Sequence, residues 1–261
     1  EKGNIMYNST TGIKSYDYGD GLINGVLRPY IQQANPLCSN QLDTNESEGN
    51  SVNAIGFAEV RFLKDFKFTS TNSVSSEETR STITTNPWFG QYASQNGAIT
   101  VEHDRTWSYN YQQLLTWHHQ FDQHEVDAML GHEYYRRRYY VLYGDKTNMY
   151  TFPSNDMASA VNTGSPNSYR NDYNTEGWFG RVQYNYDQKY FASMSYRRDA
   201  SSRFAPENRW GNFWSFGGAW MISKEKFFNV SWIDELKIKA SYGEQGNDNI
   251  QDQYGFDQFL Y

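Results

Sequence analysis

The chain has 261 residues, of which 38% are apolar and 18% aromatic, and its formal net charge is −7. No run of 18 or more apolar residues occurs, which excludes a helical membrane protein, and the negative charge argues against a nucleic-acid-binding surface. The single cysteine, Cys38, excludes an internal disulfide and a cysteine metal cluster. A β-barrel is compatible with this polar composition, because only alternate residues of each strand need to face lipid.

Residues 1–50 contain more loop signals than strand signals. Ile5 and Tyr7 begin one short stretch with strand character, whereas residues 19–21 and 24–25 are turn signals, and residues 29–50 are rich in Asn, Gln, Ser and Glu. The beginning of the chain lacks the apolar segment of a signal peptide. A β-barrel of the outer membrane must be exported and therefore needs such a peptide. If the chain is part of such a barrel, the sequence predicts an internal piece of a longer chain.

Paired strands are predicted from residue 51 onward, because residues of alternating character are separated by polar turns. Within the strand at 106–118, Gln112 and Gln113 interrupt the alternation and predict a bulge. The first predicted hairpin has strands at 52–63 and 66–78 around a turn at Lys64-Asp65, and a polar loop at 79–104 follows it. The second has the strand at 106–118, a turn at 119–123 and a strand at 124–143, and a polar loop at 144–174 follows it.

The clearest alternation lies between Thr175 and Asn249. In residues 176–186, Val182 and its even-numbered neighbours form an apolar face, whereas Gln183 and its odd-numbered neighbours form a largely polar one. Further elements follow as a turn at 187–189, a strand at 190–199, a loop at 200–211, a strand at 214–222, a turn at 223–234 and a strand at 236–242.

A soluble sheet would show the same alternation, and two further features distinguish a barrel. Trp and Tyr residues gather on the apolar face near strand ends, and the connections are alternately short and long. A transmembrane barrel needs both features, because its wall has aromatic girdles and its two rims carry tight turns and long loops. The predicted fold class is all-β: an antiparallel transmembrane β-barrel wall of about eight strands, each near the ~10 residues that cross a bilayer.

Six stretches, spread between residues 58 and 247, resemble the SusC-like TonB-dependent transporters of Bacteroidetes outer membranes. They are AEVRFLKDFKFTS at 58–70, HEVDAMLGHEYY at 124–135, GWFGRVQYNYDQKY at 177–190, YRRDASSRFAPENRWG at 196–211, AWMISKE at 219–225 and LKIKASYGEQGN at 236–247. The resemblance implies a plugged barrel of about 22 strands. Residues 1–261 would then be part of one barrel domain: residues 1–50 are loop-rich with one strand, 51–249 are a meander, 250–261 begin the next loop or strand, and the plug domain lies outside this chain.

The resemblance also implies a function. Such a protein imports glycans or oligosaccharides through the outer membrane, together with a SusD-like surface lipoprotein and the TonB-ExbB-ExbD complex, and it needs neither catalytic residues nor a cofactor. One alternative is the same transporter class with peptides or siderophores as cargo. Another is a secreted, soluble β-sandwich that binds or cleaves glycans, which explains neither the alternating connection lengths nor the six stretches.

Five charged residues are predicted to face the barrel lumen or the plug. They alternate with residues that would contact outer-membrane lipid, and a charge facing hydrocarbon at mid-depth costs ~2–4 kcal/mol. These candidates are Arg181, Arg197, Asp199, Lys237 and Lys239. Four aromatic residues on the predicted outer loops, Trp88, Phe89, Tyr92 and Tyr169, are candidates for stacking on a substrate such as a sugar ring, or for packing the loops together.

No metal site is predicted from the spacing of the five histidines, which read as rim and lumen residues. Asn247, Asp248 and Asp252 offer the oxygen atoms that calcium prefers, but they lack the spacing and the closing glutamate of an EF-hand. The sequence leaves calcium binding at this loop open.

Overall fold

The computed structural model describes residues 6–7, 12, 14–15, 40–88 and 90–249. Cys38 and the element expected at residues 250–261 lie outside the described residues. Within the first 50 residues, β1 (Met6–Tyr7) and β2 (Lys14–Ser15) pair as a small antiparallel sheet. No helix in the described part of the chain is long and apolar enough to cross a membrane.

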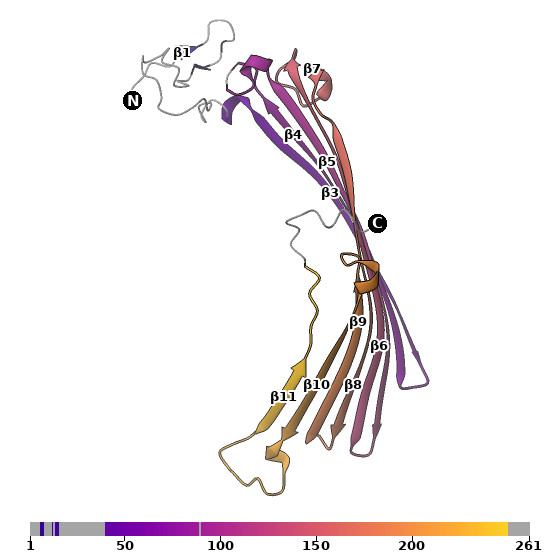
Figure 1. Cartoon of the computed structure of the whole chain (residues 1–261). Coiled ribbons are helices and arrows are strands. Elements are labelled where there is room, and N and C mark those ends of the chain that lie inside the picture. The colour runs from indigo at the N-terminus through magenta and orange to yellow at the C-terminus, as the bar shows by residue number, and fades with distance from the viewer. Residues whose placement is uncertain (1–5, 8–11, 13, 16–39, 89, 250–261) are drawn as a thin grey trace. The chain divides into compact units, whose positions relative to one another are not determined.

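Eight long strands form one sheet, in the order β11-β10-β9-β8-β6-β5-β4-β3, with the short β7 paired to β6 (Figure 1). The strands are β3 (Thr44–Phe62), β4 (Phe66–Thr85), β5 (Ala98–Phe121), β6 (His124–Met149), β7 (Ala160–Thr163), β8 (Asn167–Tyr186), β9 (Tyr190–Ser201), β10 (Trp210–Met221) and β11 (Lys237–Gly243). Four single turns of 3-10 helix lie in the connections: η1 (Ala93–Gln95), η2 (Met157–Ser159), η3 (Pro206–Asn208) and η4 (Ile222–Lys224). The predicted antiparallel meander of about eight strands is confirmed.

Five strands are much longer than predicted, because β3 to β6 and β8 contain 19 to 26 residues each. The expected polar loops at 79–104 and 144–174 are therefore largely strand, and only shorter connections such as 86–97 remain. A strand segment with water on both sides needs no apolar face, so its sequence lacks the alternation that reveals a half-buried strand. The Thr- and Ser-rich end of β4 also lacks an apolar face, because its buried residues are Thr82 and Thr84, and these β-branched residues suit an extended backbone.

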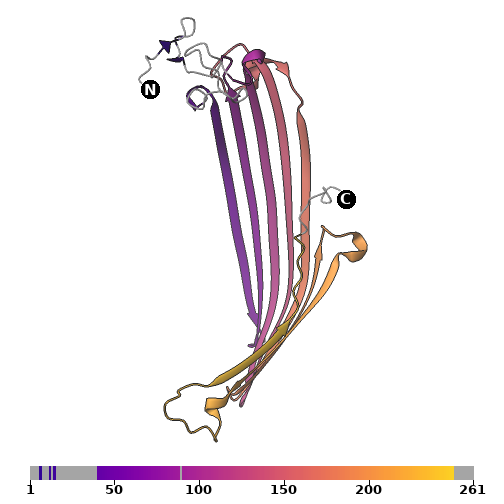
Figure 2. The same ribbon diagram turned by 60° about the vertical axis from the view of Figure 1, so that its left-hand side comes forward.

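The chain divides into two compact units, through which the long strands run. Unit 1 consists of residues 1–51, 77–105 and 140–170, and unit 2 of residues 52–76, 106–139 and 171–261. In unit 1 a small core of Ile99, Met149 and Ala160 is packed against Phe152 and Met157. Figure 2 shows η1 and β7 of this unit at the same end of its strands.

In unit 2, the four predicted turns lie at one end of the strands, because backbone hydrogen bonds join each to its neighbour. The amide of His118 donates to Asp65 O at 3.0 Å, that of Asp187 to Gln123 O at 2.8 Å, and that of Met221 to Lys189 O at 2.8 Å. The connection with η3 lies at the opposite end of β9 and β10. This arrangement is the one expected when short turns occupy a single rim.

Strand register in unit 2 separates an apolar face from a polar face. Val182 pairs with Met194, Met194 with Phe216, and Phe216 with Tyr242, so these side chains share the apolar face. Gln183 and its cross-strand neighbours lie on the opposite, polar face. Val182 and Phe216 are each 48% exposed, so nothing in the described residues covers the apolar face. A soluble protein would bury such a surface.

The expected bulge at Gln112-Gln113 is wrong, because β5 does not exchange its faces there. Gln113 lies near His132 on the apolar face, with Oε1 and Nδ1 3.3 Å apart, and Tyr111 on the same face contacts the same ring. Leu114 points to the polar face, where it helps to fill the space beside Gly131. The pattern looked broken because one polar side chain lies on the apolar face and one apolar side chain on the polar face.

Two groups of aromatic rings border the apolar face. The first follows the turn end of the strands, with successive ring centroids 4.9 to 6.5 Å apart; it contains Phe62, Phe66, Trp117, His119, Phe121, His124, Tyr184, Tyr186, Tyr190, Trp220 and Phe227. The second contains Tyr109, Tyr111, His132, Tyr134, Trp178, Tyr196 and Trp214. On β9, Tyr190 and Tyr196 are six residues apart, or ~20 Å along a strand. The spacing is close to the ~25 Å apolar band of outer-membrane barrels.

Gly131 provides a test of how closely the wall is packed. A Cβ atom at this position would lie 2.3 Å from the Phe179 ring, whereas one at Gly218, in β10 between β9 and β11, would meet only Phe191 O, at 3.8 Å. We therefore expect Gly131→Leu to lower the stability of the full-length protein by ~1–3 kcal/mol through overpacking. Gly218→Leu is the matched control and should leave the urea unfolding midpoint nearly unchanged. Equal midpoints for the two variants would contradict the packing of Phe179 over Gly131.

Candidate functional site

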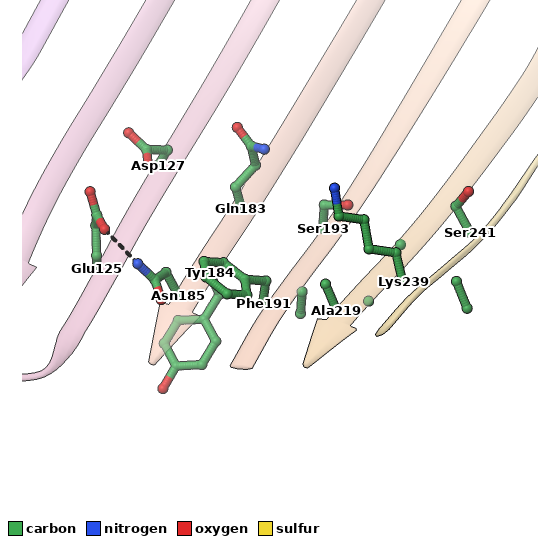
Figure 3. A pocket seen from close by; sticks show the side chains of 14 residues that line it. Glu125, Asp127, Gln183, Tyr184, Asn185, Phe191, Ser193, Ala219, Lys239 and Ser241 are labelled. Atoms are coloured by element: carbon green, nitrogen blue, oxygen red, sulfur yellow. Dashed lines mark hydrogen bonds between the residues drawn. The ribbon is translucent and has the colours of Figure 1, made fainter. Parts of the chain in front are cut away.

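The polar face of unit 2 carries a shallow cavity of about 470 Å³ that spans β6, β8, β9, β10 and β11. Figure 3 shows its lining: carboxylates from β6, amides from β8 and a lysine from β11 project on the same side of the sheet. Asn185 Nδ2 donates a hydrogen bond to Glu125 Oε2 at 2.8 Å. The cavity is open, and its charged and amide side chains can contact solvent, ions or a hydrophilic ligand beside an apolar part formed by Phe191 and small residues.

The centre of the polar face is an ion-pair network around Arg197 of β9. Arg197 Nε donates to Asp199 Oδ2 at 2.6 Å, and Nη2 of the same guanidinium contacts Glu133 Oε1 of β6. The guanidinium also lies over the Phe179 ring, 5.1 Å from its centroid. Gly177 of β8 makes this arrangement possible, because a Cβ atom there would lie 2.5 Å from Asp199 Oδ1. The network thus joins three strands through the space left by a glycine.

The other three charged candidates also lie on the polar face, but they make different contacts. Lys237 Nζ is 4.0 Å from the centroid of the Phe191 ring, an arrangement that favours a cation. Lys239 lines the cavity of Figure 3, and Arg181 lines a neighbouring one of about 610 Å³. Among the described residues, neither Lys239 nor Arg181 makes an ion pair. Their charges are therefore available to a partner or ligand.

Asp248 ties the segment after β11 to the wall. Its Oδ2 accepts hydrogen bonds from Tyr173 Oη at 2.6 Å and from Ser201 Oγ at 2.8 Å, and its carbonyl accepts one from Arg203. Burial raises the pKa of Asp248, but the hydrogen bonds from Tyr173 and Ser201 outweigh burial and hold the pKa below its ordinary value. The carboxylate form, and the attachment that depends on it, therefore persist at neutral pH.

Two of the three candidate calcium-binding residues make hydrogen bonds to protein groups. Asp248 uses one carboxylate oxygen on two hydroxyl donors, and Asn247 Oδ1 accepts a hydrogen bond from the amide of Asn249 at 2.9 Å. The third candidate, Asp252, lies outside the described residues. The contacts that are seen hold the loop in place through protein groups.

The four candidate aromatic residues are not gathered into one platform. Trp88 is half-buried and contacts Phe152 edge-on, with centroids 5.2 Å apart, so it packs the connections of unit 1. Tyr92 is also half-buried, and its carbonyl accepts hydrogen bonds from the amides of Gln95 and Gly97. Tyr169 lies in strand β8 rather than in a loop and is 51% exposed. Phe89 lies outside the described residues.

Sequence reasoning missed two groupings on the polar face. The contact of Arg197 with Glu133 crosses β8, and no local spacing reveals a pairing of residues 64 positions apart. His118, Glu125 and Asp127 each offer one ligand atom, and the three atoms lie within 4.8 Å of one another. The signal for this second group was the tight turn at residues 122–123, which places the two ends of the hairpin opposite each other.

Comparison with known proteins identifies what the chain is similar to. No family model matches the sequence. The chain is 29% identical over 258 residues to the TonB-dependent receptor SusC of Bacteroides thetaiotaomicron. This alignment covers 95% of this chain and 24% of that protein. The chain is also 28% identical over 219 residues to the TonB-dependent receptor P3 of Formosa agariphila. That alignment covers 83% of this chain and 22% of the receptor.

A solved structure of the RagAB peptide transporter is similar in fold, with a TM-score of 0.78 and 23% identity over 90% of this chain and 29% of that one. The chain therefore spans about a quarter of the length of the relatives that it matches. The resemblance to SusC-like TonB-dependent receptors is confirmed, and the fold is that of an outer-membrane β-barrel wall, whose sheet the described strands do not close. These relatives are receptors and transporters, not enzymes.

The Arg197 network predicts an asymmetric response to the loss of two arginines. Arg197→Ala leaves Glu133 and Asp199 close together without their shared cation, so we expect it to lower the unfolding free energy of the full-length protein by about 1–3 kcal/mol. Arg181→Ala, on the same face but without an ion pair among the described residues, is the control and should cost little. The effect of Arg197→Ala should shrink when Glu133→Gln is already present. Equal denaturant midpoints for Arg197→Ala and Arg181→Ala would contradict the network.

Proposed function

We propose that this stretch of a SusC-like receptor forms part of the wall of a TonB-dependent importer for glycans or oligosaccharides. The observation that supports the proposal most strongly is the two-faced sheet: an uncovered apolar face bordered by two aromatic groups, and a polar face with charged side chains. The similarity to SusC over 95% of the chain agrees with it. Because this chain spans only about a quarter of its relatives, the activity, the cargo and the partners of the whole protein are part of the proposal.

In this proposal the polar face lines the barrel lumen and contacts the plug. Arg197 pairs with both Asp199 and Glu133, so in this proposal Arg197 and Asp199 stiffen the wall and their contribution is structural. Lys239 and Arg181 make no ion pair in the described part of the chain, and they are the residues best placed to contact the plug or a passing substrate. Lys237 is held over the Phe191 ring, so its charge is partly engaged within the wall and partly available to another group.

The choice of cargo rests on a few observations. Tyr169 is 51% exposed and has the kind of ring that can stack on a sugar, and Trp88 packs against Phe152. The similarity in fold to the RagAB peptide transporter favours peptides as the second candidate cargo. No observation here favours siderophores or a secreted β-sandwich over these two.

The proposed mechanism breaks no covalent bond in the cargo. The wall supplies a hydrogen-bonded sheet whose backbone groups are satisfied by neighbouring strands, as hydrocarbon requires. A SusD-like lipoprotein would hold the substrate at the cell surface, and the TonB-ExbB-ExbD complex would supply the energy by acting on the plug. No residue of this chain is assigned a catalytic task, and no cofactor is required.

Deletion of the full-length gene tests the proposal through uptake. We expect the deletion strain to lose growth on one glycan as sole carbon source, and a plasmid copy to restore it. The protein purified from native outer membranes in mild detergent should carry a surface lipoprotein with it. Loss of growth on peptides with glycan growth unchanged would favour the second cargo. Normal uptake of both, with no co-purified lipoprotein, would contradict the importer proposal.

A further inference from the structure

We propose that His118, Glu125 and Asp127 form a divalent-cation site of the Zn²⁺ class on the polar face of the β5–β6 hairpin. The inference is independent of the cargo, because it rests only on side chains near the turn at residues 122–123. One imidazole and two carboxylates are a donor set that Zn²⁺ accepts in proteins. Three protein ligands leave one coordination position open for water or for a group from another part of the protein.

Hairpin geometry brings the three ligands together. The turn has two residues, so Phe121 lies opposite His124, and His118 lies opposite Asp127. His118 Nδ1 is 2.8 Å from Asp127 Oδ1. Glu125 is two residues from Asp127, and side chains at that spacing in a strand share one face. Figure 3 shows Glu125 and Asp127 on the side of the sheet that carries Gln183.

The distances are compatible with metal coordination after small side-chain rotations. The three candidate ligand atoms lie within 4.8 Å of one another. Ligands at ~2.0–2.2 Å from a tetrahedral Zn²⁺ are themselves roughly 3.3–3.6 Å apart. His118 and Asp127 have exposed side chains and Glu125 is half-buried, so rotation about their side-chain bonds can close the difference. No backbone movement is needed.

Two carboxylates supply the negative charge of the site. Glu125 and Asp127 lie on the same face, and in residues 40–88 and 90–249 neither makes an ion pair with a lysine or arginine. Lys239 lines one cavity with both carboxylates, and four cationic side chains line a second cavity with His118 and Asp127: Arg61, Lys64, Lys67 and Arg181. Arg61 and Lys67 are paired with Glu59, and none of the five cations makes an ion pair with Glu125 or Asp127 in the described structure. A bound divalent ion would replace the repulsion between the two carboxylates with attraction and would take the place of the hydrogen bond between Asp127 and the imidazole.

A supporting contact orients one ligand. Asn185 Nδ2 donates to Glu125 Oε2, which fixes the carboxylate and leaves Oε1 for the metal. Hydrogen bonds of this kind to ligating groups tune metal affinity, and their loss costs about 10- to 100-fold. Asn185 comes from β8, so a metal held here would join the β5–β6 hairpin to the neighbouring strand through this hydrogen bond.

The chain contains a natural control one residue away. His119 Nδ1 lies 2.7 Å from Asp65 Oδ2, a pair very similar to that of His118 and Asp127. The His119 ring, however, stacks on Trp117 in the aromatic group at the turn end, and no second carboxylate joins the pair in a metal-ligand group among the described residues. A histidine–aspartate pair alone should bind a metal weakly, so His119 tests whether Glu125 is what makes the site.

The experiment uses the full-length receptor in detergent, stripped of metal with a chelator and desalted. Zn²⁺ is titrated by calorimetry, and Co²⁺ by its visible absorption, which reports direct ligation. We expect His118→Ala, Asp127→Asn and Glu125→Gln each to remove the same single equivalent of binding and the same part of the Co²⁺ spectrum. Asn185→Ala should weaken that equivalent by about 10- to 100-fold. His119→Ala should leave it unchanged.

Two results would overturn the proposal. One is that the His118, Glu125 and Asp127 variants bind Zn²⁺ and give a Co²⁺ spectrum as the wild type does. The other is an equal loss in His119→Ala, which would indicate nonspecific binding by surface histidines. Each variant is first checked for the heat-dependent gel shift of a folded barrel. The near-isosteric Asp127→Asn and Glu125→Gln keep the test valid if His118→Ala fails to fold.

Discussion

The alternation of side chains across hydrogen-bonded strands is the constraint on which the rest of this structure depends. Each backbone group in a membrane-spanning sheet must pair with a neighbouring strand, and this pairing fixes the register. Once Val182 is opposite Met194, the facing of every residue in the two strands follows. A slip by one residue would exchange the two faces completely. The aromatic borders, the Arg197 network and the polar cavities all follow from one register.

Glycine positions show how this constraint is used to build the polar face. Gly177 and Gly131 lie where large side chains from adjacent strands need room, so Arg197 of β9 can extend across β8 and the Phe179 ring of β8 can lie over β6. The result is a polar face on which some charges are engaged with one another and others make no ion pair in the described part of the chain. In the proposed importer, the engaged charges would stiffen the wall and the others would remain for plug or substrate.

Much of unit 2 could be predicted from the sequence, because one face of each strand is apolar and the other polar. Residues 176–186 gave the correct faces and the correct end at Tyr186. The extension of β6 to Met149 could not be predicted, because a strand without an apolar face has no diagnostic period. The contact between Glu133 and Arg197 could not be predicted either, since it crosses an intervening strand. Gln113 and Leu114 misled the prediction because each lies on the face opposite to its polarity.

The central claim is that the apolar face contacts lipid, and two neighbouring substitutions in the full-length protein test it most directly. Val182→Arg places a charge on the apolar face between the two aromatic groups, and it should lower the unfolding free energy of the barrel by ~2–4 kcal/mol. Gln183→Arg places the same charge on the polar face and should have almost no effect on folding. Denaturant midpoints in lipid vesicles measure both. Equal tolerance at the two positions, or greater damage at Gln183, would contradict the account.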